Sequence, residues 1–420
     1  MRLFVIAVFY DEKRNGFYPK CCSFTKHVKN SIITLCIIRK GEKLMSNPVR
    51  ILNLFTVMNR GGAETMVMNY YRNVDRTKVQ FDFMVHRQER GAYDDEIEAL
   101  GGRIYRMPPV QPGHFKEYKA KIKEFFDEHG EYSVIHSHMS ELGYFVFREA
   151  KKRGVGCTVC HAHNAPHFKD ETMIEKAKDL VRAYFKNRIR KYTDHKFICG
   201  LEAGDWLFGK NSREEFVMMN NAVDAKKFSW NAQRAEELRE KLCLKDKFVI
   251  CHVGRFNPQK NHTFLIDIFK EIYKKNPQSV LLLVGAGDLE EKVRQQVEEY
   301  SLGDSVRFMG LRDDVDDILV ASDVFLFPSL YEGLPVTLVE AQSSGIKCII
   351  SDTITPDCMI TENVEAVSLG QSAQIWAQRV LRYADGYDRK DTYSDIVAAK
   401  FDIRENAAWL EEFYLNECKK

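Results

Sequence analysis

From residue 50 onward, short apolar segments alternate with longer segments of helical periodicity, and this alternation runs twice along the chain. Apolar segments of this length fit strands that are buried on both faces of a sheet. Repeats of strand, helix and strand predict parallel sheets that are covered by helices on both sides. We therefore expect an α/β protein with two doubly wound, Rossmann-like domains that face each other across a cleft.

The expected strands form two sets, which are separated by the polar stretch 222–247. The first set comprises residues 50–57, 81–86, 103–108, 133–138, 157–162 and 195–200. The second set comprises residues 248–254, 279–285, 306–310, 324–329 and 347–352. We accordingly expect an N-terminal domain over 48–225, a C-terminal domain over 226–400 and a final segment over 401–420, because 420 residues exceed one ordinary core.

Residues 1–47 are expected to lie outside both domains. The first 45 residues carry an excess of six positive charges, and Met45 opens a segment that leads directly into the first expected core strand. Two interpretations stay open for this extension. It is either a mis-called stretch upstream of a true start at Met45, or a disordered basic tail.

Composition excludes several classes of protein. The formal net charge is +2 and no basic face dominates the chain, which argues against a nucleic-acid partner. Eleven cysteines do not form a disulfide framework in a chain of this size, so a reducing cytoplasm is the simpler location. Cys157 and Cys160 with His161 and His163 resemble half of a metal or redox site, but a zinc site needs four ligands. The segment is interpreted as a buried strand, and no metal is expected.

Two cations follow the first strand of the second set. Arg255 and Lys260 come after residues 248–254, beside an expected helix start. A diphosphate needs such neutralisation, because arginine donates forked hydrogen bonds and lysine supplies a point charge. In the first set, Gly62 lies in a turn between a strand and a helix, where a backbone can approach an anion closely. The alternatives are solvated surface charges and an ordinary turn.

His138 ends the expected strand 133–138, and His136 should face the same side of the sheet. A histidine at the end of a strand could bind a sugar hydroxyl or a departing oxygen. Packing in the core is an alternative of at least equal weight for His136, and the same choice stays open for His161 and His163.

The stretch 331–345 contains Glu332 and Glu340. Gly333 and Pro335 argue against a helix through Glu332, and Pro335 suits the first position of a helix. Glu332 is therefore expected in a loop and Glu340 more than one turn inside the helix. The backbone amides around Leu334 would form a second anion site. The acidic cluster 312–317 is interpreted as a solvated helix start.

Residues 176–192 hold seven Lys or Arg and one acid, with apolar residues at helical spacing. A basic amphipathic helix can lie on an anionic membrane surface. Packing of the apolar stripe on the protein's own domain is the alternative, and both stay open. No apolar run reaches the length of about 18–20 residues that a membrane span needs.

Taken together, the residues resemble a known family. The two-domain pattern, Arg255 with Lys260 and the segment "EGLPVTLVE" are similar to the family-4 retaining glycosyltransferases of GT-B fold. The segments "NRGGAETMVMNYYRN" and "FPSLYEGLPVTLVEAQSSGI" resemble especially its bacterial capsule and exopolysaccharide branch, over about residues 48–415. Asn220-Asn221-Ala222 and Gly285-Ala286-Gly287 depart from commoner forms of the family, Pro-Asn-Gly and Gly-Asp-Gly.

The resemblance implies a set of roles. Glu332 and His138 would lie at the transferred sugar as catalytic groups, with Glu332 positioning it and stabilising charge. The implied donor-binding residues are Gly62, Arg255, Lys260, Gly310, Leu311, Gly333, Leu334, Pro335 and Glu340. Within this set, Arg255 and Lys260 would hold a diphosphate, Glu340 the ribose, and Gly310 with Leu311 would border the base. The final segment would be a helix that crosses back to the N-terminal domain.

The resemblance therefore implies a cytoplasmic enzyme that moves a sugar, with retention, from a nucleotide-sugar donor to a lipid-linked or oligosaccharide acceptor. The donor is expected to be a UDP-sugar and the pathway capsule or exopolysaccharide synthesis. No cofactor is implied, because Arg, Lys and helix amides would stabilise the leaving diphosphate. Peripheral contact with the inner face of the membrane through 176–192 is a further expectation. The alternative activity is a nucleotide-sugar 2-epimerase of the same fold.

Overall fold

The computed structural model describes residues 5–11, 16–22, 47–111, 113–163 and 173–419. It forms two units, Met1–Pro48 and Val49–Lys420. The first unit contains an antiparallel hairpin of β1 (Val5–Asp11) and β2 (Gly16–Cys22). Residues 23–46 lie outside the described part, and a start of translation at Met45 stays a prediction.

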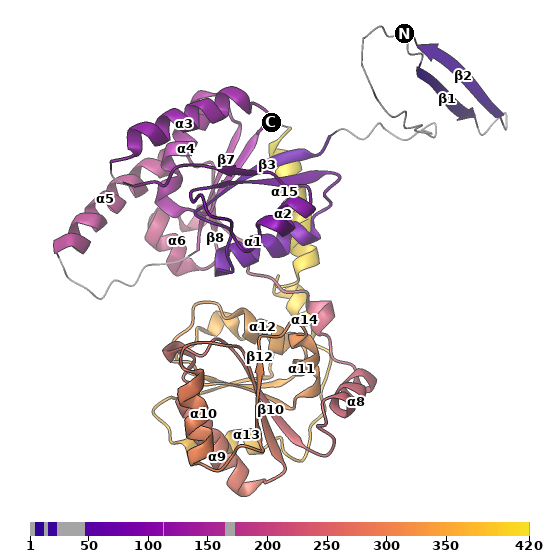
Figure 1. Cartoon of the computed structure of the whole chain (residues 1–420), viewed down its shortest axis with the longest axis vertical. Coiled ribbons are helices and arrows are strands. Elements are labelled where there is room, and N and C mark those ends of the chain that lie inside the picture. Colours follow the sequence, from indigo (N-terminus) through magenta and orange to yellow (C-terminus); the bar gives the residue numbers. More distant parts are fainter. Residues whose placement is uncertain (1–4, 12–15, 23–46, 112, 164–172, 420) are drawn as a thin grey trace. The chain divides into compact units, whose positions relative to one another are not determined.

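The first sheet of the second unit has seven parallel strands in the order β5-β4-β3-β6-β7-β8-β9 (Figure 1). These are β3 (Val49–Phe55), β4 (Val79–Val85), β5 (Ile104–Arg106), β6 (Val134–Ser137), β7 (Cys157–Ala162), β8 (His195–Ile198) and β9 (Phe216–Met218). The helices of this region are α1 (Gly62–Asn73), α2 (Asp94–Ala99), α3 (Phe115–Glu128), α4 (Tyr144–Lys152), α5 (Met173–Ile189) and α6 (Leu201–Phe208).

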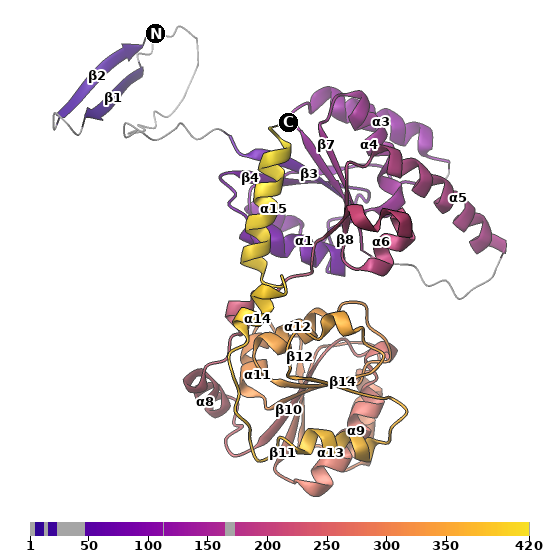
Figure 2. The same ribbon diagram turned by 180° about the vertical axis from the view of Figure 1, so that it is seen from behind.

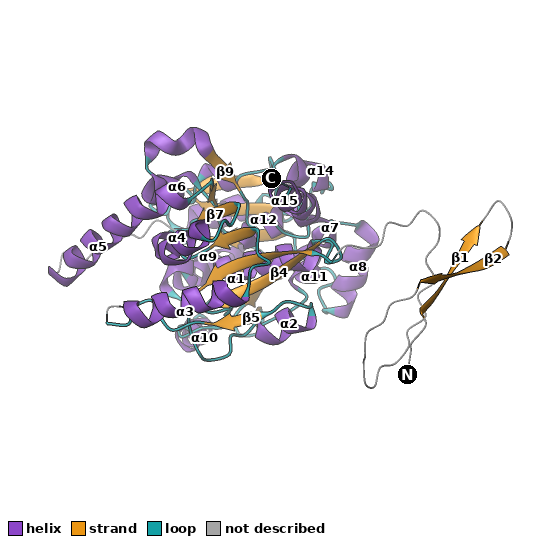
Figure 3. Cartoon of the chain, turned by 90° about the horizontal axis from the view of Figure 1, so that it is seen from above, coloured by secondary structure: helices purple, strands orange, loops and turns teal. Residues whose placement is uncertain are grey.

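Each face of the first sheet has its own apolar core, because successive side chains of a strand point to opposite faces. On β3, Ile51 and Phe55 belong to one core and Leu52 and Leu54 to the other. Because the strands are buried on both faces, their sequences are nearly continuous apolar runs. Figure 3 shows the strands lying between helices.

The second sheet has six parallel strands in the order β12-β11-β10-β13-β14-β15. These are β10 (Phe248–Val253), β11 (Ser279–Val284), β12 (Val306–Gly310), β13 (Val324–Phe327), β14 (Lys347–Ser351) and β15 (Val364–Val367). The accompanying helices are α7 (Ala225–Phe228), α8 (Ala232–Lys241), α9 (His262–Lys275), α10 (Glu290–Glu299), α11 (Val315–Ala321), α12 (Val336–Ser343), α13 (Ala373–Leu381) and α14 (Tyr393–Ala398). Parallel pairing confirms the predicted α/β class with two doubly wound sheets.

The last helix, α15 (Ile403–Glu417), packs against α1 and contributes to the core of the first sheet (Figure 2). Asp402 caps it by accepting hydrogen bonds from the backbone amides of Arg404 and Glu405. Ile403, Ala407, Leu410 and Tyr414 are the helix residues that enter this core. The chain therefore returns to the first sheet after completing the second.

Three sequence-based interpretations need correction. The edge strands β9 and β15 were not predicted; each is short and pairs with only one neighbouring strand. Pro335 is the residue before α12 rather than its first residue. The acidic cluster is not simply solvated, because Asp316 is buried and lies 2.9 Å from the ammonium of Lys227 and 2.6 Å from the guanidinium of Arg234.

Candidate active site

Two neighbouring loops at the carboxyl ends of β10 and β13 form the centre of the candidate site. β10 and β13 pair directly, so the loops that follow them, 254–261 and 328–335, lie side by side. The backbone amide of Leu330 donates to the carbonyl of Gln259 at 2.8 Å. The side chain of Asn261 donates to the carbonyl of Pro328 at 3.1 Å. These hydrogen bonds fix the two loops to each other.

A buried ion pair joins the same loops. The ammonium of Lys260 donates to Oε1 of Glu332 at 2.7 Å, and its nitrogen lies 4.4 Å from the centre of the Phe327 ring. The amide of Gln259 donates to Oε2 of Glu332 and to the carbonyl of Tyr331, each at 3.0 Å. Each carboxylate oxygen of Glu332 therefore accepts one hydrogen bond from the Lys260 loop and keeps a further lone pair. Gln259 was not singled out from the sequence, although its place between Arg255 and Lys260 was the available signal.

Arg255 is exposed and, within the described part of the chain, forms no ion pair or side-chain hydrogen bond. An arginine that follows a buried strand and has no protein partner can donate its five N–H groups to a ligand. The structure thus places Arg255, Lys260 and Glu332 at one edge of the second sheet.

Close backbone packing explains the glycines of the segment 283–290. Gly285 has a φ of +139°, and a Cβ there would lie 2.1 Å from the carbonyl oxygen of Gly254. A Cβ at Gly287 would lie 2.5 Å from the carbonyl oxygen of Phe256. The two glycines let the turn after β11 support the loop that carries Arg255. The interpretation of this segment as a turn at the end of a strand is confirmed.

Glu340 lies inside α12, whereas Glu332 lies in the loop before it, as the proline between them predicts. Burial raises the pKa of Glu340 to about 7, with Lys227 opposing the shift and Asp316 adding to it. At the start of α12, the buried hydroxyl of Thr337 has no hydrogen-bond partner among the described residues. Thr337 was not predicted as a site residue, and it lies where the helix offers its amides to an anion.

The remaining donor-side candidates occupy loop positions. Gly333 is exposed, Leu334 is half-buried and Pro335 is buried. Gly310 ends β12 with a φ of +66°, and Leu311 is 77% exposed. β12 is separated from β10 by β11, so the Gly310–Leu311 turn is not adjacent to the Lys260 loop in the sheet. Among the residues that the structure describes, no hydrogen bond or ion pair joins this turn to Glu332.

The first sheet positions the other two candidates. Gly62 opens α1, and a Cβ there would meet no atom within 4 Å. His138 follows β6, stacks on Phe55 at 4.5 Å between ring centres, and its Nδ1 lies 2.8 Å from Nε2 of His163. Nε2 of His138 lies 3.4 Å from Oδ1 of Asn53. The ring is thus held in one orientation from both of its nitrogens.

His138 belongs to a cluster of imidazoles at the carboxyl end of the first sheet. His136 is buried and its Nδ1 lies 2.6 Å from the hydroxyl of Tyr414, which confirms the core interpretation for His136. Burial lowers the pKa of His136, His138 and His161 well below the usual value and that of His163 to about 4. These imidazoles are therefore neutral at physiological pH.

The same cluster contains two sets of potential metal ligands. His136, His138 and His161 form one set and His161, His163 and Cys199 the other, each with ligand atoms within 4.8 Å of one another. Cys157 and Cys160 face opposite cores on β7, so the half-site suggested by their spacing does not form. Cys199 was not predicted as a potential ligand, because it belongs to the next expected strand, 195–200, and lies 36 residues from His163 in the sequence. The absence of a bound metal stays a prediction.

The apolar residues of the basic segment 176–192, most of which lies in α5, are found in two environments. Phe185 and Ile189 are buried in the core of the first sheet. Leu180, Val181 and Tyr184 are 75%, 54% and 51% exposed. Packing on the protein's own domain therefore accounts for only part of the stripe. Across the described residues, no helix combines the length and apolar character that would let it cross a membrane.

Residues 234–393 match the family model described as glycosyl transferases group 1. The chain is 34% identical over 381 residues to EpsF of Bacillus subtilis (strain 168), which is named as a glycosyltransferase, covering 88% of this chain and 97% of EpsF. The chain belongs to the group 1 glycosyltransferases. It is an enzyme of this family, and the predicted resemblance is confirmed.

Two further relatives place this glycosyltransferase among polysaccharide enzymes. It is 32% identical over 292 residues to the UDP-Gal:alpha-D-GlcNAc-diphosphoundecaprenol alpha-1,3-galactosyltransferase of Escherichia coli, covering 67% of this chain and 74% of that enzyme. It is 26% identical over 382 residues to the capsular polysaccharide biosynthesis glycosyltransferase CapH of Staphylococcus aureus, covering 88% of this chain and 99% of CapH. These relatives are transferases by name, so the comparisons do not favour the 2-epimerase alternative.

Solved structures confirm the GT-B fold. The crystal structure of HepE from Anabaena in complex with UDP matches with a TM-score of 0.69 at 19% identity, covering 87% of this chain and all of HepE. Sucrose-phosphate synthase from Thermosynechococcus elongatus matches with a TM-score of 0.64 at 20% identity, covering 87% of this chain and 98% of the synthase. At these identities the likeness concerns the fold alone.

Proposed function

We propose that this glycosyltransferase moves one sugar, with retention, from a UDP-sugar to a lipid-linked or oligosaccharide acceptor in capsule or exopolysaccharide synthesis. One observation carries the proposal: Arg255, Lys260 and Glu332 gather on two hydrogen-bonded loops at the carboxyl edge of the second sheet. Ligands of open α/β sheets bind at this edge. The E. coli relative, named for UDP-Gal and a diphosphoundecaprenol acceptor, supports the choice of donor and acceptor.

In this proposal the donor's diphosphate is held by Arg255, Lys260 and the amides that begin α12. Arg255 supplies a forked pair of N–H donors and Lys260 a compact charge, so the negative charge that develops on the leaving diphosphate is stabilised. No metal is required for this step. The carboxylate of Glu340 accepts hydrogen bonds from the ribose hydroxyls, and the Gly310–Leu311 turn borders the base.

Glu332 faces the transferred sugar while its charge is balanced by Lys260 at 2.7 Å. The ion pair links the cation that neutralises the diphosphate to the carboxylate that positions the sugar. Glu332 therefore stabilises developing positive charge on the sugar as the bond to the diphosphate breaks. From the first sheet, Gly62 approaches the phosphates. His138 keeps the contact of its Nδ1 with His163, and its Nε2 exchanges the 3.4 Å contact with Asn53 for a hydrogen bond to the sugar.

Peripheral contact with the inner face of the membrane is part of the proposal, and it places the enzyme in the cytoplasm. The exposed residues Leu180, Val181 and Tyr184 on the basic helix α5 support it. An apolar face flanked by cations suits the boundary between headgroups and acyl chains of an anionic membrane. A lipid-linked acceptor would be met at that boundary.

A panel of nucleotide sugars in a thermal-shift assay tests the donor proposal. A bound donor stabilises the folded state by RT ln(1 + [L]/Kd) and thereby raises the melting temperature. We expect UDP-sugars to stabilise the wild type and Arg255→Ala to lose that stabilisation. Lys270→Ala, which changes a lysine on α9, serves as the matched control. Equal stabilisation of Arg255→Ala and wild type, or none with any nucleotide sugar, would contradict the donor site.

Product analysis separates transfer from the 2-epimerase alternative. An epimerase converts the donor to its epimer when no acceptor is present. We expect the donor sugar to keep its configuration in that reaction, and to appear on a lipid-linked acceptor when one is added.

A further inference from the structure

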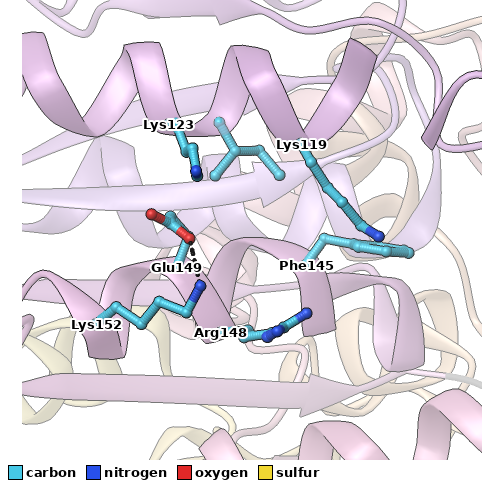
Figure 4. Close-up of a pocket in the computed structure, with 7 residues that line it drawn as sticks. Lys119, Lys123, Phe145, Arg148, Glu149 and Lys152 are labelled. Atoms are coloured by element: carbon cyan, nitrogen blue, oxygen red, sulfur yellow. Dashed lines mark hydrogen bonds and ion pairs between the residues drawn. The ribbon is translucent and has the colours of Figure 1, made fainter. Parts of the chain in front are cut away.

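A hollow of about 240 Å³ lies between α3 and α4 on the first domain. Its lining combines four cations and one acid with two apolar side chains. The lining residues are Lys119, Ile122, Lys123, Phe145, Arg148, Glu149 and Lys152. Figure 4 shows Lys119 and Lys123 on one helix and Phe145, Arg148, Glu149 and Lys152 on the other. We call this feature the α3–α4 groove.

The charges of the α3–α4 groove do not balance within the protein. Glu149 lies 3.2 Å from the ammonium of Lys152 and 3.4 Å from Nε of Arg153 outside the groove. Lys119, Lys123 and Arg148 form no ion pair with any residue that the structure describes. Like charges held on facing helices repel one another, and a bound anion relieves that repulsion. The groove is therefore suited to an anionic ligand.

Aromatic contacts connect this groove to the exposed face of α5. The Phe145 ring lies 5.1 Å from the Phe185 ring, which lies 5.3 Å from the Tyr184 ring. The ammonium of Lys119 lies 5.6 Å from the centre of the Phe145 ring. The guanidinium of Arg188 lies 5.1 Å from the centre of the Tyr184 ring. Cations and exposed apolar side chains thus adjoin along α3, α4 and α5.

We propose that the α3–α4 groove binds the phosphate headgroup of an anionic phospholipid while Leu180, Val181 and Tyr184 of α5 contact the same bilayer. A bilayer presents negative charge directly above acyl chains, and this arrangement complements cations beside apolar residues. A site for free phosphate would not require exposed apolar residues beside it. The inference rests on the proposed membrane contact and adds to it a specific headgroup site.

Vesicle flotation of the full-length protein tests the headgroup site. We expect binding to vesicles of phosphatidylcholine with phosphatidylglycerol, weaker binding at higher salt, and little binding to phosphatidylcholine alone. Lys119→Gln with Lys123→Gln should weaken the partition coefficient about 25-fold, since each cation near an anionic surface contributes about fivefold. Lys270→Gln with Lys274→Gln is the control for charge and spacing, because α9 carries this pair outside the groove, where Lys274 pairs with Glu271 at 2.5 Å and Lys270 contacts the Tyr300 ring.

Several outcomes would overturn the headgroup site. Equal binding to neutral vesicles or an equal loss in the α9 control would each do so. Leu180→Ser with Tyr184→Ser separates the two membrane claims. If this variant detaches and the groove variant binds like wild type, the headgroup site is wrong and the α5 contact stands. If wild type binds no vesicle, both membrane claims fail, while the donor assay still reports on sugar transfer.

Discussion

The ammonium of Lys260 lies 2.7 Å from Oε1 of Glu332, and the two side chains come from loops that follow different strands. The side chains are 14% and 6% exposed, so water reaches neither charge freely. The ion pair therefore contributes both to the stability of the second domain and to the donor site proposed there. Each partner is needed to keep the other's buried charge compensated.

Removal of Lys260 should therefore destabilise the protein more than removal of both charges. We expect Lys260→Met to lower the free energy of unfolding by about 3 kcal/mol, because the carboxylate of Glu332 is left without its partner. The double variant with Glu332→Gln should recover most of this loss. Urea denaturation of the wild type, both single variants and the double variant measures the coupling. Strict additivity of the two changes would contradict the pair.

Arg255 should affect donor binding without affecting stability. Loss of its charge-assisted hydrogen bonds is expected to weaken the donor affinity of Arg255→Ala about 10- to 100-fold. The donor affinity of Arg255→Lys should lie between those of the wild type and Arg255→Ala, because lysine keeps the positive charge but cannot donate a forked pair of hydrogen bonds. Titration calorimetry with the donor found by thermal shift gives both values. A large fall in melting temperature without ligand would show a structural role instead.

Glu340 should make stability depend on pH. Its pKa is raised from the usual 4.5 to about 7 by burial, so the folded state holds a proton that the unfolded state has released between these values. Stability should fall as pH rises from about 4.5 to 7 and then level off, by up to about 3 kcal/mol. Glu340→Gln should remove this slope. Urea denaturation at a series of pH values checks it, and an unchanged slope in the variant would assign the effect to other groups.

Ionisation of Glu340 should also make donor binding depend on pH. Only the carboxylate form of Glu340 accepts hydrogen bonds through both oxygens, so donor affinity is expected to rise as pH increases through 7. Calorimetry at pH values below and above 7 measures the change in wild type and in Glu340→Gln. A variant that keeps the full pH dependence would argue against a contact between Glu340 and the ribose.

Gly285 should tolerate no side chain. Gly285→Ala places a Cβ 2.1 Å from the carbonyl of Gly254 at a φ of +139°, so the loop that carries Arg255 must move. We expect lower stability by at least about 1 kcal/mol and weaker donor binding together. Gly303→Ala is the control, since a Cβ there meets no atom within 4 Å. Equal behaviour of the two variants would contradict the supporting role of the 285–287 turn.

Chelation should leave transfer unchanged. The proposed site neutralises the diphosphate with Arg255, Lys260 and helix amides, although the histidine cluster with Cys199 brings potential ligands together elsewhere. Prolonged dialysis against EDTA followed by a transfer assay tests this expectation. Loss of activity that zinc restores, and that Cys199→Ser mimics, would show that the cluster holds a required metal.

The sequence was sufficient for features set by local pattern. Apolar runs followed by glycine, arginine or histidine predicted the strand ends at Arg255 and His138, because parallel strands place their ends at one edge. The proline between Glu332 and Glu340 predicted their separation into loop and helix. These features depend on a few neighbouring residues and on the period of side chains along a strand.

Features that depend on long-range packing could not be predicted. The hydrogen bonds of Gln259 to Glu332 and the approach of Cys199 to within 3.2 Å of Nδ1 of His163 join segments distant in sequence. The apolar stripe of α5 gave no sign that Phe185 packs inward and Tyr184 faces out, because both lie at helical spacing. The short edge strand β9 likewise forms through pairing with β8 rather than through its own pattern.

The most direct test of the account is a transfer assay with a panel of UDP-sugars and a lipid-linked acceptor, with products identified by mass spectrometry and the new linkage by NMR. We predict one sugar added to the acceptor with the anomeric configuration of the donor retained. We expect much less product from each of the variants Arg255→Ala, Lys260→Met and Glu332→Gln. The control variant Lys270→Ala should form as much product as the wild type. Inverted product, epimerised donor without transfer, or undiminished transfer by all three variants would contradict the proposed function and its site.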